Sequence, residues 1–281
     1  MNLVHRLNWC WLPAAGIGLL LLALLPWGGL LPPDAKAADP PADLTNLPPA
    51  PKVSEFAPAE DLVYQMDKYI DELQKGTENK AAYDDLPEGK VSQTGNTMIL
   101  LAIALGVSDE GNKCKANAGA LAAACQKLAV TTEYAPTKQA VEGVVAAADG
   151  KGKGQIEVKW AKLAKLPELM KQVPNVNTKL KTYTNPKYPE RLVSKAKESR
   201  AASATLAVIA QGDMANVGDT IKPTESKKWF EFSKEMREAA TAVNRSIRAK
   251  DVKAVSENMD RLQQSCDDCH VIFHPKKGGE K

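Results

Sequence analysis

Three residues near the C-terminus have the types and the spacing that could hold an iron porphyrin. Cys266, Cys269 and His270 form the pattern C-x-x-C-H, the attachment signature of a c-type haem. Two thiols can add across the two vinyl groups of the porphyrin, and the next residue can place its imidazole on the iron as the proximal ligand. The sequence therefore predicts one covalent haem c, with Cys266 and Cys269 as attachment residues and His270 as the metal ligand.

Two other kinds of site use the same residue types. A thioredoxin-like redox pair of Cys266 and Cys269 would need a strand followed by a helix, and the sequence around the motif predicts no strand. A zinc site could recruit His274 beside the two cysteines and His270. One straight helix does not readily wrap four ligands around one ion, and no second ligand pair occurs elsewhere. Haem attachment is the favoured interpretation.

A long amphipathic helix is predicted to carry the motif. It begins near Asp251, a suitable N-cap, and its apolar positions alternate in steps of three and four as in helical bundles. The two cysteines continue this stripe and are therefore expected to face the interior. The stripe comprises Val252, Val255, Met259, Leu262, Cys266, Cys269 and Phe273. We expect the side chains that shield the haem from water to be Trp229, Phe232, Met236 and Met259.

Helical spacing also dominates the rest of the chain after Ala59. The predicted fold class is all-α, an antiparallel helical bundle or bundles with haem on the last helix. We expect a helical domain without a haem motif at 59–173, a connection at 174–187 and a c-type haem bundle at 188–281. The predicted helices cover 59–75, 91–106, 114–132, 136–149, 155–166, 168–173, 189–211, a segment after Pro223 and a segment from Asp251.

The N-terminal part of the chain has the features of an export signal. Residues 1–37 combine an early basic residue, a long apolar stretch and a small-x-small site that ends at Ala37, so we expect cleavage after Ala37 and a periplasmic location. Without cleavage, the apolar stretch is long enough to anchor the chain in a membrane. Residues 38–58 are rich in proline and are predicted to form an extended linker.

The composition excludes some functions and leaves one cysteine pair open. The formal net charge is only +3, from 37 basic and 34 acidic residues, so nothing favours a nucleic-acid partner.

Cys114 and Cys125 share one predicted helix, and eleven helical residues would separate them by about 16 Å, beyond the reach of a disulfide. A late start of that helix would permit a bridge. Both a disulfide and two buried thiols remain alternatives.

The C-terminal third resembles the class II c-type cytochromes, the cytochrome c prime group of antiparallel helical bundles. The resemblance covers about Pro189 to Lys281. It depends on Trp229 and on two motifs, Ile209-Ala210-Gln211-Gly212-Asp213 and Cys266-x-x-Cys269-His270-x-x-Phe273. It implies a haem near the C-terminus and a homodimer. The segment 100–106 is similar to 206–212, which suggests that the first helical domain is a degenerate copy without haem.

The chain departs from that family at three places. Low-spin members carry a methionine on the first helix as sixth iron ligand, and the corresponding position here is Ala196. The residue after the haem-side Phe273 is His274 where relatives often have arginine. The stretch 212–223 is too short for a second helix, so a segment such as 155–173 is expected to complete the bundle.

The predicted function is that of an exported monohaem electron carrier with a redox partner protein, and not an enzyme. The sixth position is expected to be open, or else occupied by Met214, which follows the helix that ends near Gln211. A methionine ligand would favour electron transfer. An open iron suggests the alternative function, a five-coordinate haem protein that binds NO or CO as a sensor or scavenger.

Overall fold

The computed structural model describes residues 48–275, and within this range it contains helices and no strands. This confirms the all-α prediction. The α-helices are α1 (Val53–Phe56), α2 (Ala59–Gly76), α3 (Lys80–Asp84), α4 (Lys90–Val107), α5 (Ala118–Leu128), α6 (Tyr134–Ala148), α7 (Leu166–Tyr183), α8 (Glu190–Ser194), α9 (Ala196–Asp213), α10 (Ser226–Ala249) and α11 (Val252–Phe273). Helices α2, α4, α6, α10 and α11 agree with the predicted ones to within a few residues, because their apolar stripes repeat every three to four residues. Helix α9 begins at Ala196, seven residues later than predicted.

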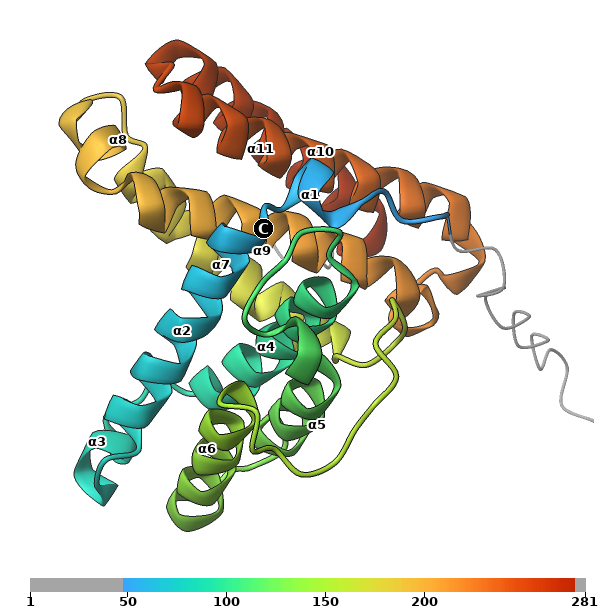
Figure 1. Cartoon of the computed structure of the whole chain (residues 1–281). Helices are drawn as coiled ribbons and strands as arrows, with labels where there is room; N and C mark the ends of the chain where they lie inside the picture. Colours follow the sequence, from blue (N-terminus) through green and yellow to red (C-terminus); the bar gives the residue numbers. More distant parts are fainter. Residues whose placement is uncertain (1–47, 276–281) are drawn as a thin grey trace, which may run out of the picture. The chain divides into compact units, whose positions relative to one another are not determined.

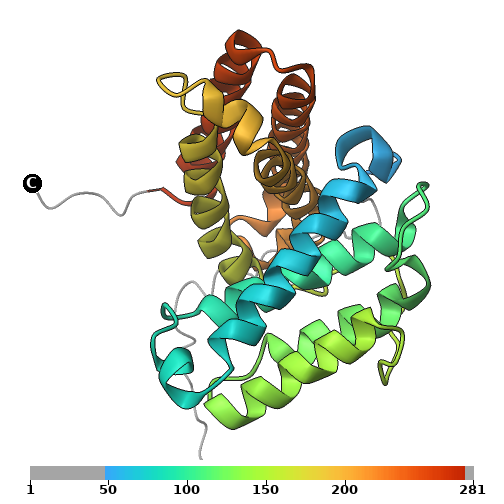
Figure 2. The same cartoon turned by 60° about the vertical axis from the view of Figure 1, so that its left-hand side comes forward.

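Four helices, α7, α9, α10 and α11, form an antiparallel bundle (Figures 1 and 2). The order of the contacts between α10 and α11 shows that these two helices run in opposite directions. Arg261 on α11 binds Glu235 near the middle of α10, whereas Phe273 at the end of α11 packs on Trp229 at the start of α10. Lys181 near the end of α7 donates to Gln263 on α11. The bundle therefore uses α7 as its fourth wall.

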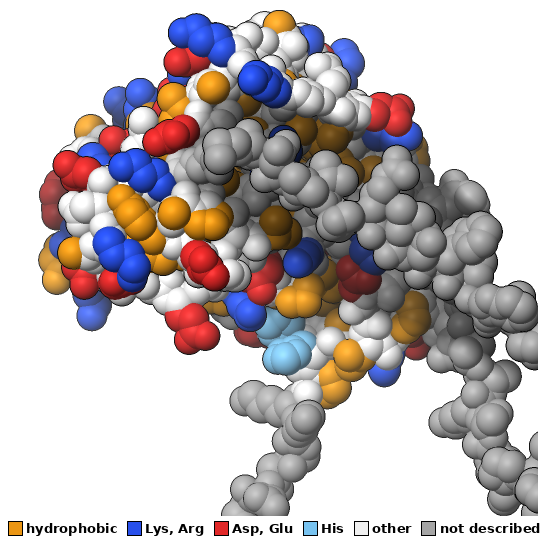
Figure 3. All heavy atoms as spheres, turned by 90° about the horizontal axis from the view of Figure 1, so that it is seen from below, with side chains coloured by type: hydrophobic (Ala, Val, Ile, Leu, Met, Phe, Trp, Pro, Cys, Tyr) orange, Lys and Arg blue, Asp and Glu red, His pale blue; other side chains and the backbone are white. Residues whose placement is uncertain are grey.

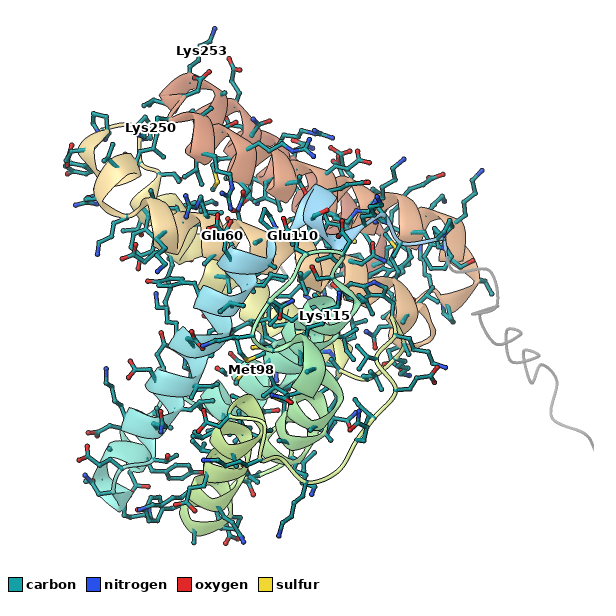
Figure 4. All side chains as sticks on the ribbon, viewed as in Figure 1. Glu60, Met98, Glu110, Lys115, Lys250 and Lys253 are labelled. Atoms are coloured by element: carbon teal, nitrogen blue, oxygen red, sulfur yellow. The ribbon has the colours of Figure 1, made fainter. Side chains whose placement is uncertain are left out.

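The other long helices, α2, α4, α5 and α6, pack beside this bundle, and α4 is their centre. Helix α4 is buried on nearly all sides, and its second half is apolar from Met98 to Leu105, as expected of a helix that is surrounded by others. Met98 lies inside and is fully buried (Figure 4). The Gly212 backbone approaches so near to α4 that a Cβ would lie 2.6 Å from Leu100 Cδ1. The small residue therefore lets α9 lie directly on α4.

A buried charge cluster connects α2 to the bundle. Asp61 on α2 is 1% exposed, and its carboxylate accepts hydrogen bonds from Arg200 on α9 and from Asn244 and Arg248 on α10. A buried carboxylate needs such partners, because its desolvation is otherwise very costly. The cluster joins the predicted helical domain at 59–173 to the predicted haem bundle at 188–281.

The prediction of a connection at 174–187 needs correction, because α7 continues through Pro174 and ends only at Tyr183. Proline removes one backbone hydrogen bond from a helix, but the apolar face of α7 continues past it and packs on α9 and α4. Tertiary packing outweighs the local cost. Conversely, residues 155–165 of the helix predicted at 155–166 are not helical, and Ile156, Val158 and Trp160 pack on the core from this irregular segment.

The predicted linker at 38–58 differs from its predicted form, and so does the helix predicted at 114–132, of which α5 covers only Ala118–Leu128. The end of the predicted linker at 38–58 is part of the folded core, since Val53 and Phe56 of α1 are 2% and 3% exposed. Of the two alternatives for Cys114 and Cys125, a disulfide or two buried thiols, the structure has the two buried free thiols. Cys114 lies before a short 3-10 turn and Cys125 lies inside α5.

The predicted signal at 1–37 lies outside the described residues. Within 48–275, no helix combines the length and the apolar character that crossing a bilayer requires.

Candidate functional site

The last helix carries the cysteine motif, and local signals explain where it begins. The Asp251 side chain accepts a hydrogen bond from the backbone N–H of Ala254 at 2.9 Å, which caps the first turn as predicted. Lys250 before it has φ 56°, the left-handed conformation that ends α10. Val255, Met259, Leu262 and Phe273 of the stripe along α11 are buried, and Cys266 and Cys269 are half-buried. Val252 is 37% exposed because it lies in the first turn, beside the connection between the helices.

Both cysteines of the motif open into one pocket of about 270 Å³, together with His270. We call this the cysteine pocket. Its walls come from α7, α10, α11 and the end of α9. Side chains that define it besides the motif are Met170, Val173, Asn177, Asp213, Trp229 and Phe232. The prediction that both cysteines face the bundle interior is therefore confirmed.

Aromatic residues close the end of the cysteine pocket near Phe273. The Trp229 and Phe273 rings meet edge to face with centroids 5.1 Å apart, and Phe232 packs on Phe273 at 6.3 Å. The Trp229 indole N–H donates to the Asp213 backbone carbonyl at 2.8 Å. This bond fixes the start of α10 against the end of α9. Of the side chains predicted to shield the site, Met259 does not line the pocket but belongs to the main core.

The environment of the two thiols keeps them protonated. Burial raises the pKa of Cys266. Burial also raises the pKa of Cys269 to about 12, and the negative charges of Asp213 and Cys266 add to this effect. Reactive cysteines of redox enzymes have lowered pKa values. With no strand in the described part of the chain, the site lacks both features of the thioredoxin-like alternative.

The cysteine pocket also contains two polar atoms without a hydrogen-bond partner. These are Asp213 Oδ1 at the end of α9 and Asn177 Oδ1 on α7. Asp213 is 2% exposed, and burial raises its pKa well above the ordinary value. Buried polar atoms normally have partners. These two would provide a donor and an acceptor for the polar parts of a bound group.

The sixth-ligand candidates from the sequence do not lie at this pocket. Ala196 begins α9 and packs on the main core. Met214 is 2% exposed, and its sulfur lies 3.8 Å from Gln211 Nε2. The methionines that do line the pocket are Met170 on α7 and Met236 on α10.

The predicted and observed methionines differ because the sequence predicts the first helix of the bundle at 189–211, whereas α7 is the helix that faces α11 across the cysteine pocket. A periodic signal for α7 was present. Leu166, Leu169, Val176 and Leu180 lie on one apolar face across Pro174 and are all buried. A helix that continues through Pro174 carries both Met170 and Asn177, which line the cysteine pocket.

The donor set and the lining of the pocket suit a covalently attached haem. The two thiols lie one turn apart on α11, with an imidazole beside them and aromatic and thioether side chains on the walls. The volume lies below the roughly 300–1,000 Å³ of typical small-molecule sites, so a porphyrin requires α7 and α11 to separate further. An exposed hydrogen bond between Lys181 and Gln263 joins these helices directly, at 2.7 Å, and such bonds resist separation weakly.

The residues considered for a zinc site do not form a suitable cluster. His270 and His274 are exposed and stack edge to face at 5.4 Å. In residues 48–275, no group of three or more His, Cys, Asp or Glu side chains could hold a metal ion.

Comparisons of the chain with protein-family models, with curated proteins and with solved structures found no match.

Proposed function

We propose that the protein is an exported monohaem c-type cytochrome that transfers electrons and is not an enzyme. Haem c would be attached through Cys266 and Cys269, with His270 as its proximal iron ligand. The observation that carries the proposal is that all three side chains of the C-x-x-C-H motif open into the same pocket. Helix geometry alone puts the three residues on one face, and the support comes from the aromatic and thioether side chains that line the pocket around them.

When bound, haem supplies reversible one-electron exchange at its iron. The chain's own residues have separate tasks. The aromatic cluster of Trp229, Phe232 and Phe273 excludes water from one end of the cysteine pocket. Cys266 and Cys269, one turn apart on α11, would hold the group in one orientation. Low water access and fixed orientation both tune a haem site.

The position of the motif near the surface supports exchange with a redox partner protein. His270 is exposed, and the next residue, Val271, is 74% exposed. Figure 3 shows histidine side chains at the surface with hydrophobic side chains close by. A redox group close to such a surface can pass electrons to a docked protein. We place this exchange in the periplasm because of the predicted signal at 1–37, or at the membrane if that segment is not cleaved. The resemblance to class II cytochromes adds a homodimer to the proposal.

A second candidate function is binding of NO or CO by a five-coordinate haem. The α7 wall of the cysteine pocket supports it, because Val173 and Pro174 have no side-chain atom that could bind iron. Met170 on the same wall supports electron transfer, because its thioether can bind iron. The side chain of Met170 therefore separates the two candidates.

The attachment can be tested by mass spectrometry of mature protein produced with a cytochrome c maturation system. We expect the peptide that contains Cys266 and Cys269 to carry the mass of one haem, and the reduced protein to show a c-type alpha band. Cys266→Ala and Cys269→Ala should each remove one thioether. Cys125→Ala is the matched control, since this buried thiol lies in α5, and it should retain full haem content. An unmodified motif peptide would overturn the proposal.

The electron-transfer and gas-binding candidates differ in their response to carbon monoxide. If Met170 binds the iron, the spectrum of the reduced protein should resist CO, and Met170→Ala should make it CO-sensitive. Met236→Ala is the control, because Met236 lines the same pocket from α10 and should leave CO sensitivity unchanged. Immediate CO binding by the unaltered protein would favour the gas-binding function.

A further inference from the structure

A second pocket lies against the other side of α7. It has a volume of about 550 Å³ and is enclosed by α2, the start of α4, α7 and α9. We call it the lysine pocket. Its size falls within the roughly 300–1,000 Å³ of small-molecule sites. None of the three motif residues lines it, so it is separate from the cysteine pocket.

The floor of the lysine pocket is made of amides and a phenol, of which only the Asn175 amide is exposed. Gln172 Nε2 donates to Tyr69 Oη at 3.0 Å, and Asn175 Nδ2 donates to Gln93 Oε1 at 3.0 Å. Tyr69 and Gln172 are each 2% exposed, and Gln93 is 9% exposed. Burying amides is unfavourable unless they are hydrogen-bonded. Their concentration at one cavity, from three different helices, provides donors and acceptors for a polar ligand.

One floor residue has unused hydrogen-bonding capacity. Gln65 on α2 is 7% exposed, and its side chain lines the lysine pocket. No hydrogen bond of this side chain occurs within the part of the chain that the structure describes. A buried amide with free capacity, aimed at a cavity, indicates a ligand that supplies the missing partner.

Four lysines and two glutamates line the pocket, so its rim carries more positive than negative charge: Lys68, Lys90, Lys171 and Lys179 against Glu88 and Glu198. Lys90 and Lys179 share one carboxylate, Glu72, at 2.9 and 3.8 Å. Burial alone would raise the pKa of Glu72, but the hydrogen bond from Lys90 and the charges of Lys90, Lys179 and Lys68 lower it overall. The single charge of Glu72 is thus matched against two ammonium groups.

Two further lysines on the rim differ in their pairing. Lys171 pairs with Glu168 at 2.9 Å. Lys68 forms no salt bridge among residues 48–275, and the rim carboxylate of Glu198 is already paired with Lys195 at 3.0 Å. Lys68 is therefore free to bind an anion at the mouth of the pocket.

We propose that the lysine pocket binds a small organic anion that also carries hydroxyl groups. Lys68 and Lys179 would bind the charged oxygens, because hydrogen bonds between ions are about twice as strong as neutral ones. Gln65, Gln172 and Tyr69 would bind the hydroxyl groups. A lysine ammonium acts as a compact point charge, so a carboxylate and a phosphate ester satisfy the same chemistry.

The proposal is tested by calorimetric titration of the full mature protein with three probes. Gluconate carries a carboxylate, glucose 6-phosphate carries a phosphate ester, and glucose is neutral. We expect at least one anionic probe to bind saturably below about 10 mM, and glucose to bind at least about 10-fold more weakly. Which anion binds more tightly identifies the charged group. Absence of binding by both anions up to that concentration, or equal binding of glucose, would overturn the proposal.

Variants locate the binding in the lysine pocket. Lys68→Gln and Lys179→Gln should each weaken binding of the anionic probe about 10-fold, since each removes one charge-assisted contact. Lys253→Gln is the matched control. Its side chain is 87% exposed, at the turn between α10 and α11 (Figure 4), and its loss should leave the affinity unchanged. The three substitutions are at exposed or half-buried positions, and circular dichroism verifies that each variant is folded. Equal affinities of all three variants would contradict the assignment.

Binding at the lysine pocket does not depend on the proposed haem. The titration is therefore repeated on a Cys266→Ala, Cys269→Ala double variant. Retained binding there would separate this site from the redox function, whereas loss of binding in that variant alone would contradict a site independent of the cysteine pocket.

Discussion

Replacing Asp61 by asparagine should strongly destabilise the fold, because Asp61 is the buried centre of the charge cluster between α2, α9 and α10. Its Oδ1 accepts from Arg200 Nε at 3.2 Å, and its Oδ2 accepts from Asn244 Nδ2 at 2.9 Å and from Arg248. Asp61→Asn keeps the shape of the side chain but removes the charge. Two arginines then lose their shared counter-ion.

The expected cost follows from the exposure of the partners. Breaking a buried ion pair costs roughly 3–5 kcal/mol. The Arg200 and Arg248 side chains are 25% and 31% exposed, and Arg248 also binds Glu60. Solvent therefore compensates in part, and we expect the low end of the range, about 3 kcal/mol. For a chain of this size, that corresponds to a fall in Tm of roughly 6–12 °C.

Urea and thermal unfolding, followed by far-ultraviolet circular dichroism, measure this cost. Asp67→Asn is a matched control on the same helix, because it makes the same change in an exposed pair with Lys113, where the side chains are 49% and 59% exposed. Exposed pairs contribute less than about 1 kcal/mol. If Asp61→Asn cost no more than Asp67→Asn, the inference that Asp61 holds α2 on the bundle would be refuted.

Three further measurements test packing and ionisation. Gly95→Ala should destabilise the fold by about 1–3 kcal/mol, because the new Cβ would lie 2.9 Å from the Ala129 backbone. Gly143→Ala should stabilise the fold by about 0.5–1 kcal/mol, because its Cβ would meet nothing within 4 Å. Chemical denaturation measures both free energies of unfolding, and a change of the opposite sign in either variant would contradict the described packing. Burial raises the pKa of Asp213 in the folded state. The folded protein therefore loses stability as the pH rises above the unfolded-state pKa of about 3.9, because the buried carboxyl group must then either stay protonated or carry an unfavourable charge. In haem-free protein Asp213→Asn should therefore be more stable than the unaltered chain at pH 7 and equally stable below about pH 4, and equal stabilities at both pH values would contradict this sign. Cys269, with its pKa raised to about 12, should react slowly with iodoacetamide at pH 7.5 in haem-free protein and faster as the pH rises; rapid alkylation at neutral pH would show that the thiol is not buried as described.

Much of the helical framework could be predicted from local pattern. The Asp251 cap, the stripe through Val255 and Leu262, and the inward direction of Cys266 and Cys269 depend on residues within one helix. These features are observed in α11. A stripe of period 3.6 states which face of a helix is apolar without reference to any other helix.

Local pattern failed where packing against distant residues decides the outcome. Pro174 predicts a break, yet α7 continues through it because Leu169, Val176 and Leu180 lie on one face and are buried. The helix predicted at 155–166 has apolar residues at suitable spacing, but residues 155–165 pack on the core without forming a helix. Both errors concern the fourth wall of the bundle, and they led to Ala196 and Met214 in place of Met170.

The sequence by itself determined that the chain is helical, that a C-x-x-C-H motif ends an amphipathic helix, and that its two thiols point inward. Those properties follow from residue type and spacing within one segment. Only the tertiary structure decided that α7 closes the bundle, which methionines face the cysteines, and that lysines and amides from three helices line a second pocket. The reason is physical: burial, ion pairing and the raised pKa values of Asp213 and Cys269 depend on neighbours that are remote in sequence, and no local pattern encodes those distances.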